Sequence, residues 1–368
     1  MVYTWQIGSG TELKKKIDYL IIGQGLAGSA IAWELSKRGK SILVFDEPVK
    51  NRASAYAAGL FNPITGRVMT KAWQADTVFP FLEKSYSHAE KKLKRKFLHL
   101  LPVYRPFVSP EEKQQWKQKS ETEELKKFLL TFHGPRSFSH TVRDPFGGIE
   151  IAQSGYLNVV SWMSAVRDFL REHDAYKEEA FQEQDLLFDE GVQYKEFRAG
   201  KIIFCNGLSA LGSRWFSWLP LKPLKGETLD VKIQSVANRI YNRGVYLVPT
   251  SEEGRYKVGA TYQHPPFLEG PSEAANQELV TKLLELTAMP FEIIHQDWGI
   301  RPTTPDRRPM LGPHPSNKNV IIFNGLGTKG VSLAPYFAYH LANWMEGEGD
   351  LSGEVNIYRF KALYSVLL

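Results

Sequence analysis

One stretch, residues 17–47, constrains what this chain can fold into more than any other. Residues 19–22 are a short apolar run that predicts a buried strand, and a G-x-G-x-x-G loop at residues 23–28 follows it directly. Apolar residues then recur at helical spacing, and a second apolar run ends on Asp46. Strand, glycine loop, helix, strand and carboxylate in this order predict a βαβ unit that binds a dinucleotide.

Each glycine of this loop has its own physical role. Gly23 allows a tight turn out of the strand, Gly25 lets the backbone approach a pyrophosphate, and Gly28 lets helix and strand pack closely. The helix begins at Leu26 and Ala27, where free N–H groups and the positive end of the helix dipole favour phosphate.

The second strand ends on two acidic residues, Asp46 and Glu47. Asp46 lies eighteen residues after Gly28, close to the spacing of a carboxylate that binds a ribose hydroxyl. A carboxylate at this place suits an unphosphorylated ribose, so the pattern favours FAD or NAD over NADP.

Composition narrows the class of protein. With 368 residues the chain is long enough for a large core and two domains, and no apolar run reaches the length of a membrane span. The single cysteine, Cys205, excludes an internal disulfide and indicates a cytoplasmic protein, and the nine histidines form no metal-binding pattern. The net charge of +6 owes much to residues 84–96 and 113–127. Such blocks are usually solvated helix faces, although the first could attract a polyanion.

Two segments beyond the opening unit could line a cofactor. Small residues dominate residues 52–63, as they would where backbone lies against a flat ring or a phosphate, although a closely packed helix has the same composition. A strand at residues 201–205 ends on Asn206 and Gly207, at the sheet edge where open α/β folds bind ligands. Residues 77–101 and 111–131 are predicted to be helical.

The second half of the chain begins as β structure and ends on another strand–loop–helix unit. Residues 245–249 and 256–261 are expected to pair as a hairpin, and Ser272 can cap a helix. A buried strand at residues 320–323 runs into a glycine loop at residues 325–330 and then a helix. Two helix ends that stabilise negative charge exceed what NAD needs and favour FAD.

Together these segments resemble the D-amino-acid oxidase (DAO) superfamily of FAD-dependent oxidoreductases, in particular its glycine oxidase and sarcosine oxidase branch. The resemblance runs from about residue 17 to 346 in the family's order. It is carried by the first glycine loop with Asp46 and by residues 54–59, 155–157, 223–227, 245–249, 299–306 and 325–330.

The resemblance implies an α/β fold in which a Rossmann-like βαβ domain binds FAD and a discontinuous α+β domain on an antiparallel sheet binds substrate. The FAD-binding domain would comprise residues 1–80, 147–221 and 291–368, and the substrate domain residues 81–146 and 222–290. The implied reaction is oxidation of an amine or amino acid. Hydride passes from the carbon bearing the nitrogen to flavin N5, and the imine hydrolyses. FAD would be non-covalent, since no cysteine lies near the last glycine loop, where sarcosine oxidases attach flavin.

The same resemblance assigns candidate catalytic residues. Arg301 matches an arginine that pairs with a substrate carboxylate, with a structural salt bridge to Asp306 as the alternative. Tyr246 matches a tyrosine facing the substrate, with core packing as the alternative. Lys329 is placed to offset charge near flavin N1 and O2, with a surface lysine as the alternative. Thr328 stands where glycine oxidase-like sequences often have a second arginine. This difference weakens the prediction that the substrate is a small amino acid. The residues expected to contact FAD are Gly23, Gly25, Leu26, Ala27, Gly28, Asp46, Glu47, Arg52, Ser54, Ala58, Gly59, Asn206, Gly207, Arg301, Gly325, Gly327, Thr328, Lys329 and Gly330.

Two further functions stay open beside a small-molecule substrate. The family includes a tRNA wobble-modification domain that removes a carboxymethyl group from nitrogen, and residues 84–96 would then form a phosphate-binding face. The other is a flavin-binding protein without turnover. Trp298 and Tyr262 are candidates for pocket walls, although aromatic packing explains them as well, and residues 62–67 have no assigned role.

Overall fold

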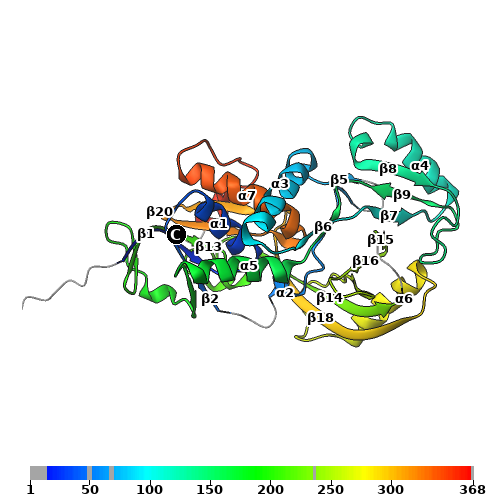
Figure 1. The fold of residues 1–368 in the computed structure, drawn as a ribbon. Helices are drawn as coiled ribbons and strands as arrows, with labels where there is room; N and C mark the ends of the chain where they lie inside the picture. Colours follow the sequence, from blue (N-terminus) through cyan, green and yellow to red (C-terminus); the bar gives the residue numbers. More distant parts are fainter. Residues whose placement is uncertain (1–14, 48–51, 66–69, 235–237, 366–368) are drawn as a thin grey trace, which may run out of the picture.

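The computed structural model describes residues 15–47, 52–65, 70–234 and 238–365, and places two large sheets side by side (Figure 1). The first sheet carries the predicted dinucleotide unit, and the second is the predicted antiparallel platform. Within the described residues, no helix is long and apolar enough to cross a membrane.

The βαβ unit is confirmed. β1 (Lys15–Ile22) leads into α1 (Leu26–Lys37) and then β2 (Ile42–Asp46), which pairs with β1 in parallel. Alternation along β1 sends Tyr19 and Ile21 into the apolar cluster under the helices, while Leu20 and Ile22 join a second cluster on the opposite face. A strand buried on both faces explains why this run is continuously apolar.

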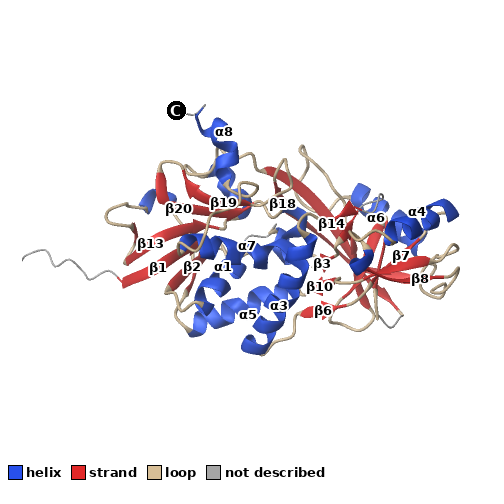
Figure 2. Cartoon of the chain, turned by 90° about the horizontal axis from the view of Figure 1, so that it is seen from above, coloured by secondary structure: helices blue, strands red, loops and turns tan. Residues whose placement is uncertain are grey.

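The first sheet has strand order β11-β2-β1-β13-β20-β19, with β12 beside β13. Its strands are parallel, except that β19 and β12 run antiparallel to their neighbours. Helices α1, α3, α5 and α7 gather on one side of it (Figure 2). The further bounds are β11 Tyr176–Glu178, β12 Val192–Tyr194, β13 Phe197–Phe204, β19 Met310–His314, β20 Asn317–Asn324, α3 Ala75–Leu93, α5 Val159–Glu172 and α7 Gly330–Met345.

The second sheet has eight strands in the order β18-β14-β17-β16-β15-β7-β9-β8, all antiparallel except for the pair β15 and β7. One face packs against α6 (Glu273–Leu286), which Ser272 caps as predicted. The strand bounds are β7 Val103–Pro106, β8 Leu129–His133, β9 Gly148–Ile151, β14 Lys222–Ile233, β15 Ile240–Arg243, β16 Val245–Pro249, β17 Arg255–Gly259 and β18 Phe291–Thr303.

Smaller elements connect the two sheets. A three-stranded sheet has the order β3-β10-β6, and β4 pairs with β5. The bounds are β3 Leu60–Phe61, β4 Ile64–Thr65, β5 Thr70–Lys71, β6 Leu98–Leu100, β10 Gly155–Leu157, α2 Ala53–Tyr56, α4 Pro110–Ser120 and α8 Lys361–Ser365, with short 3₁₀ turns at Lys126–Phe128, Glu183–Asp185, Gly207–Gly212, Gly327–Lys329 and Ile357–Phe360.

Two predicted helices are too long. The helix expected at residues 77–101 ends at Leu93, because Lys94 adopts a left-handed backbone conformation and the Glu90 carboxylate accepts the N–H groups of Phe97 and Leu98. The helix expected at residues 111–131 ends at Ser120, and a 3₁₀ turn and β8 follow it. Both predicted C-terminal halves contain short strands whose pairing partners lie elsewhere in the sequence.

The strands also bear on the predicted domain boundaries. β18 pairs with β14 along residues 291–303, and β9 pairs with β7, so both strands belong to the eight-stranded sheet. The prediction from the sequence places β9 and β18 in the FAD-binding domain instead. The division at residues 80, 146, 221 and 290 stays a prediction.

One buried histidine predicts a pH dependence of stability. His314 is 4% exposed, and its Nδ1 accepts the backbone N–H of Ser316. Burial lowers its pKa from 6.5 to about 4. The unfolded chain therefore binds the proton first, and the free energy of unfolding should fall by up to about 3 kcal/mol as pH drops from 6.5 toward 4. Four aromatic rings surround it: Trp215, Phe216, Trp218 and Tyr364.

Urea unfolding at about pH 7 and about pH 5 measures this dependence. His314→Gln should remove about 2 kcal/mol of the difference between the two conditions, whereas His88→Gln, at an exposed position, should keep it. An unchanged difference in His314→Gln would contradict the assignment.

Candidate active site

The first glycine loop is built by close packing. Gly23 has φ +93°, and a Cβ added there would lie 2.7 Å from the carbonyl oxygen of Cys205. A Cβ on Gly28 would overlap the carbonyl oxygen of Gly23. A Cβ on Gly25, by contrast, would meet only Ser54 Oγ, at 3.4 Å. Gly25 therefore faces open space that the protein itself does not fill, where a ligand can approach the backbone.

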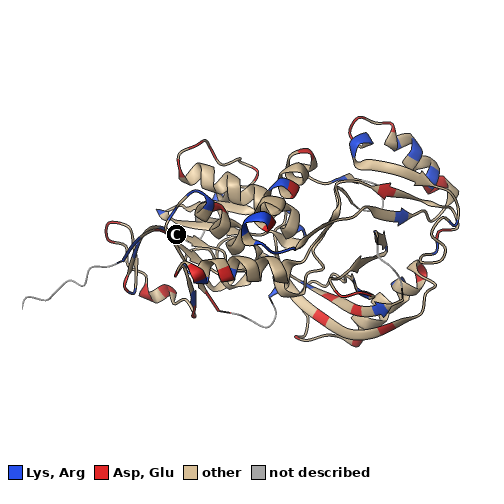
Figure 3. Ribbon diagram, viewed as in Figure 1, with Lys and Arg blue, Asp and Glu red and all other residues tan. Residues whose placement is uncertain are grey.

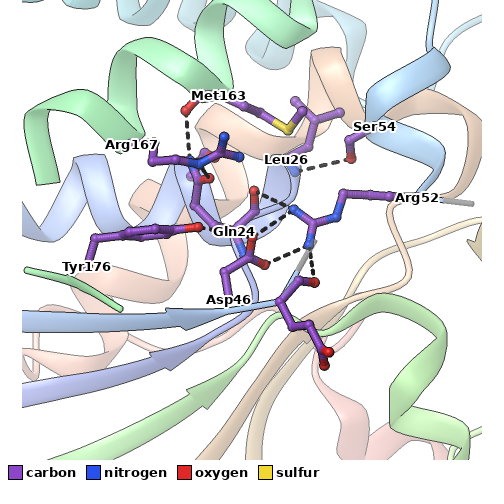
Figure 4. Close-up of polar contacts among 10 residues, drawn as sticks. Gln24, Leu26, Asp46, Arg52, Ser54, Met163, Arg167 and Tyr176 are labelled. Carbon is purple, nitrogen blue, oxygen red and sulfur yellow. Dashed lines mark hydrogen bonds and ion pairs between the residues drawn. The ribbon is translucent and has the colours of Figure 1, made fainter. Parts of the chain in front are cut away.

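Ser54 belongs to the same edge as the glycine loop. Its Oγ accepts the N–H of Leu26, the first residue of α1, at 3.3 Å (Figure 4). Ala27 is the next residue of this helix and is buried with Leu26. The predicted small-residue segment thus reaches the N-terminus of α1, where the helix dipole favours an anion.

Asp46 is covered by Arg52 rather than open to a ligand. The carboxylate is 2% exposed and accepts the N–H of Gln24 at 2.7 Å. Arg52 donates to both of its oxygens, at 2.7 and 3.0 Å, and to the carbonyl oxygen of Glu47 at 2.9 Å (Figure 4). Arg52 is the less buried of the two, so its guanidinium lies on the solvent side of the pair.

Three residues that sequence reasoning missed support this pair. The Gln24 side chain donates to Ser29 Oγ and to the carbonyl oxygen of Met163, and Arg167 donates to Gln24 Oε1 at 2.9 Å. Tyr176 lies 3.5 Å from Asp46, and burial followed by the Asp46 charge raises its pKa. Of the three, only Gln24 could be singled out from the sequence, because it is a large amide side chain between the two glycines of the loop.

The segment after Ser54 packs against the three-stranded sheet. Gly59 has φ +73°, and a Cβ there would overlap the carbonyl oxygen of Leu157. Ala58 packs against the main apolar core, and Leu60, the residue after Gly59, pairs with Tyr156. Close backbone packing thus accounts for Gly59.

The loop after β13, at Asn206 and Gly207, and the glycine loop at residues 325–330 both lie close to the first glycine loop. Asn324 donates to the carbonyl oxygen of Gly207 at 2.8 Å, and a Cβ on Gly330 would lie 3.1 Å from Leu26 of α1. The N-termini of α1 and α7 therefore converge, as the repeated motif predicts. Asn206 Oδ1 is buried without a hydrogen-bond partner among the described residues. Gly325 and Gly327 both have positive φ, at 72° and 55°, and Thr328 is exposed between them and α7.

Lys329 is half-buried at the start of α7. Burial, followed by the charge of Arg307, lowers its pKa, and no described carboxylate forms an ion pair with it. A half-buried cation at a helix N-terminus is a favourable place for a negative charge on a ligand.

Arg301 is held by a backbone carbonyl group and an aromatic ring. Its Nη1 donates to the carbonyl oxygen of Thr261 at 3.3 Å, and its guanidinium lies 5.1 Å from the ring centre of Tyr262. Below it is Gly226, where any Cβ would overlap the guanidinium. The alternative role is wrong, because Asp306 pairs with Arg359 at 2.8 Å. No described carboxylate forms an ion pair with Arg301.

Tyr246 lies on the same face of the sheet as Arg301. A Cβ on Gly259 would come within 2.5 Å of the Tyr246 hydroxyl. Burial raises the pKa of Tyr246, against a smaller lowering by Arg301, so the phenol is neutral at physiological pH. Trp298 points to the opposite face, where Lys225 lies over its ring, and does not wall this site.

Comparison with known proteins decides the family. The family model described as "DAO: FAD dependent oxidoreductase" matches residues 18–344. The chain belongs to this family. This FAD-dependent oxidoreductase is 24% identical to the glycine oxidase of Bacillus licheniformis, over 91% of this chain and 94% of the relative. It is also 24% identical to the tRNA 5-methylaminomethyl-2-thiouridine biosynthesis bifunctional protein MnmC of Hahella chejuensis, over 90% of this chain but 57% of the relative.

Solved structures agree on the fold. The glycine oxidase of Bacillus cereus superposes on this FAD-dependent oxidoreductase with a TM-score of 0.74 at 19% identity, covering 91% of this chain and 96% of the other. The predictions of the superfamily, of a Rossmann-like α/β fold, of FAD and of an oxidoreductase are confirmed.

FAD fits the residues that converge here. The space over Gly25 and the two helix N-termini suit a dinucleotide with a second anionic end. Asn206 Oδ1, which has no partner among the described residues, can accept a hydrogen bond from a hydroxyl or N–H group of the ligand. Ser54 and Gly25 would hold the pyrophosphate, Arg52 backed by Asp46 the ribose end, and Lys329 the flavin end. These individual assignments stay predictions.

Proposed function

We propose that this enzyme oxidises the C–N bond of a small amine or amino acid that carries a carboxylate, giving an imine that hydrolyses in water. The observation that carries the proposal is Arg301, a guanidinium sandwiched between Gly226 and Tyr262 with no carboxylate partner among the described residues. An unpaired, oriented arginine at a partly buried position is a ready partner for a carboxylate.

The chain's own residues bind and orient the substrate. Arg301 offers a planar pair of donors to the carboxylate, and the neutral Tyr246 hydroxyl can donate or accept a hydrogen bond beside it. Lys329 holds positive charge at the N-terminus of α7. When bound, FAD supplies the two-electron acceptor that these side chains lack. The names of the relatives, glycine oxidases among them, support an amine as substrate.

An anaerobic titration of the purified FAD-loaded protein tests the proposal. We expect glycine, sarcosine, proline or a D-amino acid to bleach the flavin absorbance, with the decarboxylated counterpart of the active compound far less effective. Equal bleaching by an amine and its carboxylated form would exclude Arg301 as the specificity group. Protein that stays colourless after incubation with FAD would refute the assignment as a whole.

A tRNA-borne secondary amine is the second candidate. Lys91, Lys92 and Lys94 at the end of α3 are exposed, and none forms an ion pair with a described residue. Acidic residues lie beside basic ones along α3 and α4 (Figure 3), so these three lysines do not extend into a larger basic surface along the two helices. If no small amine bleaches the flavin, tRNA binding that weakens steeply with salt would favour this candidate. A cytoplasmic location, proposed from the single Cys205, suits either substrate.

A further inference from the structure

A buried ion pair lies directly behind Arg301, on the other face of β14. Side chains alternate along a strand, so Gly226 lies under the guanidinium while its neighbours Lys225 and Glu227 point the opposite way. Lys225 Nζ lies 2.9 Å from Glu227 Oε1, and the two side chains are 2% and 1% exposed. Removing one partner of such a pair leaves an uncompensated buried charge and is strongly destabilising.

The Glu227 carboxylate fastens the far end of the segment whose first residues, Thr261 and Tyr262, contact Arg301. The N–H and the hydroxyl of Ser272 both donate to it at 2.8 Å, and Gln296 donates to it at the same distance. Burial alone would raise the pKa of Glu227, but these donors and Lys225 hold it below its ordinary value. The carboxylate is therefore charged at physiological pH and can hold all four donors.

The backbone of the same strand fastens the near end of the segment. The Glu227 N–H donates to Thr261 Oγ1 at 2.9 Å, and the Thr261 N–H donates to the Glu227 carbonyl oxygen at 3.2 Å. Lys225 and Gln263 exchange two backbone hydrogen bonds, each of 3.0 Å. Residues 261–272 thus form a strap that β14 holds at both ends.

The first two residues of this strap are the ones that hold Arg301. Thr261 supplies the carbonyl oxygen that accepts from Nη1, and Tyr262 supplies the ring that covers the guanidinium. Tyr262 is 65% exposed, so much of its ring faces solvent instead of being packed in place by a core. Its position over Arg301 therefore depends on how the strap is fastened.

We propose that Glu227, with Lys225 and Ser272, is a positioning residue for carboxylate recognition: it fastens residues 261–272 and so fixes the orientation of Arg301. This inference rests on the proposed role of Arg301. Glu227 itself touches no substrate. Loosening the strap lets the guanidinium sample other orientations and weakens carboxylate binding, while the glycine loop at residues 23–28, on the other sheet, keeps its own contacts.

Acetate binding to the FAD-loaded enzyme, followed by the change in the flavin visible spectrum, tests the inference. We expect Glu227→Gln to raise the Kd for acetate about ten-fold with the Kd for FAD unchanged, and to raise KM for a carboxylated substrate with little change in kcat. Ser272→Gly keeps an acceptable N-cap for α6 but loses one donor to Glu227, so it serves where Glu227→Gln fails to fold. A rise of about three-fold in the Kd for acetate is expected for it. The control is Glu278→Gln, on the exposed face of α6, where the carboxylate pairs with Lys282.

The outcomes separate the two proposals. If acetate fails to perturb the wild-type flavin, or binds equally well to Arg301→Met, the proposed function is refuted, and so is the positioning role of Glu227 that rests on it. If Arg301→Met abolishes acetate binding but Glu227→Gln and Ser272→Gly both bind it like the wild type, the positioning role is refuted and the proposed function stands. A parallel loss of FAD affinity in Glu227→Gln would show a general structural role instead.

Discussion

Replacing Gly25 with alanine is expected to leave the fold intact and to weaken FAD binding at least about 100-fold, or about 3 kcal/mol. A Cβ at this position meets only Ser54 Oγ, at ordinary contact distance, and the backbone has φ −78°, which alanine adopts readily. The protein alone therefore has room for the methyl group. The cofactor does not, because the pyrophosphate must approach the backbone where the methyl group would stand.

Quenching of FAD fluorescence on titration into apoprotein measures the affinity, and the thermal midpoint of the apoprotein measures the fold. Gly28→Ala provides the contrast, since its Cβ would overlap the carbonyl oxygen of Gly23 and should lower both quantities. Gly212→Ala is the matched control, because a Cβ there has nothing within 4 Å. Wild-type FAD affinity in Gly25→Ala would place the pyrophosphate elsewhere.

The parts of the site that the sequence predicts are those with a local steric or electrostatic signature. Gly23, Gly25 and Gly28 each satisfy a requirement of one turn and one helix end, so spacing within a few residues is enough to find them. The role of Arg301 is predicted from a motif and a family resemblance. Only the structure shows that Asp306 pairs with Arg359 and not with Arg301. The helix predicted at residues 77–101 fails for a related reason. The alternation that makes Leu98–Leu100 a strand is three residues long, and its partner β10 lies more than fifty residues away.

Several of the contacts that the sequence does not predict join segments far apart in the chain. Arg167 reaches Gln24 from α5, whereas Arg52 donates to Asp46 over a separation of six residues. The partners of Glu227 come from the N-terminus of α6 and from β18, 45 and 69 residues away. A Lys-Gly-Glu run has no periodicity that reveals which face each side chain will occupy. Only the register of β14 with β18 shows that Gly226 lies beneath a guanidinium while its neighbours form a buried ion pair.

Arg301→Met is expected to raise the KM for a carboxylated amine, or the Kd for acetate, about 100-fold or more. Two hydrogen bonds to a charged group contribute about 3 kcal/mol or more, and methionine fills much of the same volume without a donor or a charge. Arg301→Lys keeps the charge but loses the planar pair of donors and the flat contact with Tyr262, so a loss of about ten-fold is expected.

Comparing each variant on an amino acid and on its decarboxylated amine isolates the effect, because the second compound has no group for Arg301 to bind. We expect the wild-type preference for the carboxylated compound to disappear in Arg301→Met, since only binding of the carboxylate is lost. Arg171→Met is the control, because Arg171 is an exposed arginine on α5 that pairs with Glu178. A preference that persists in Arg301→Met would move carboxylate recognition to another cation, and Lys329, half-buried at the N-terminus of α7, would be the first to replace.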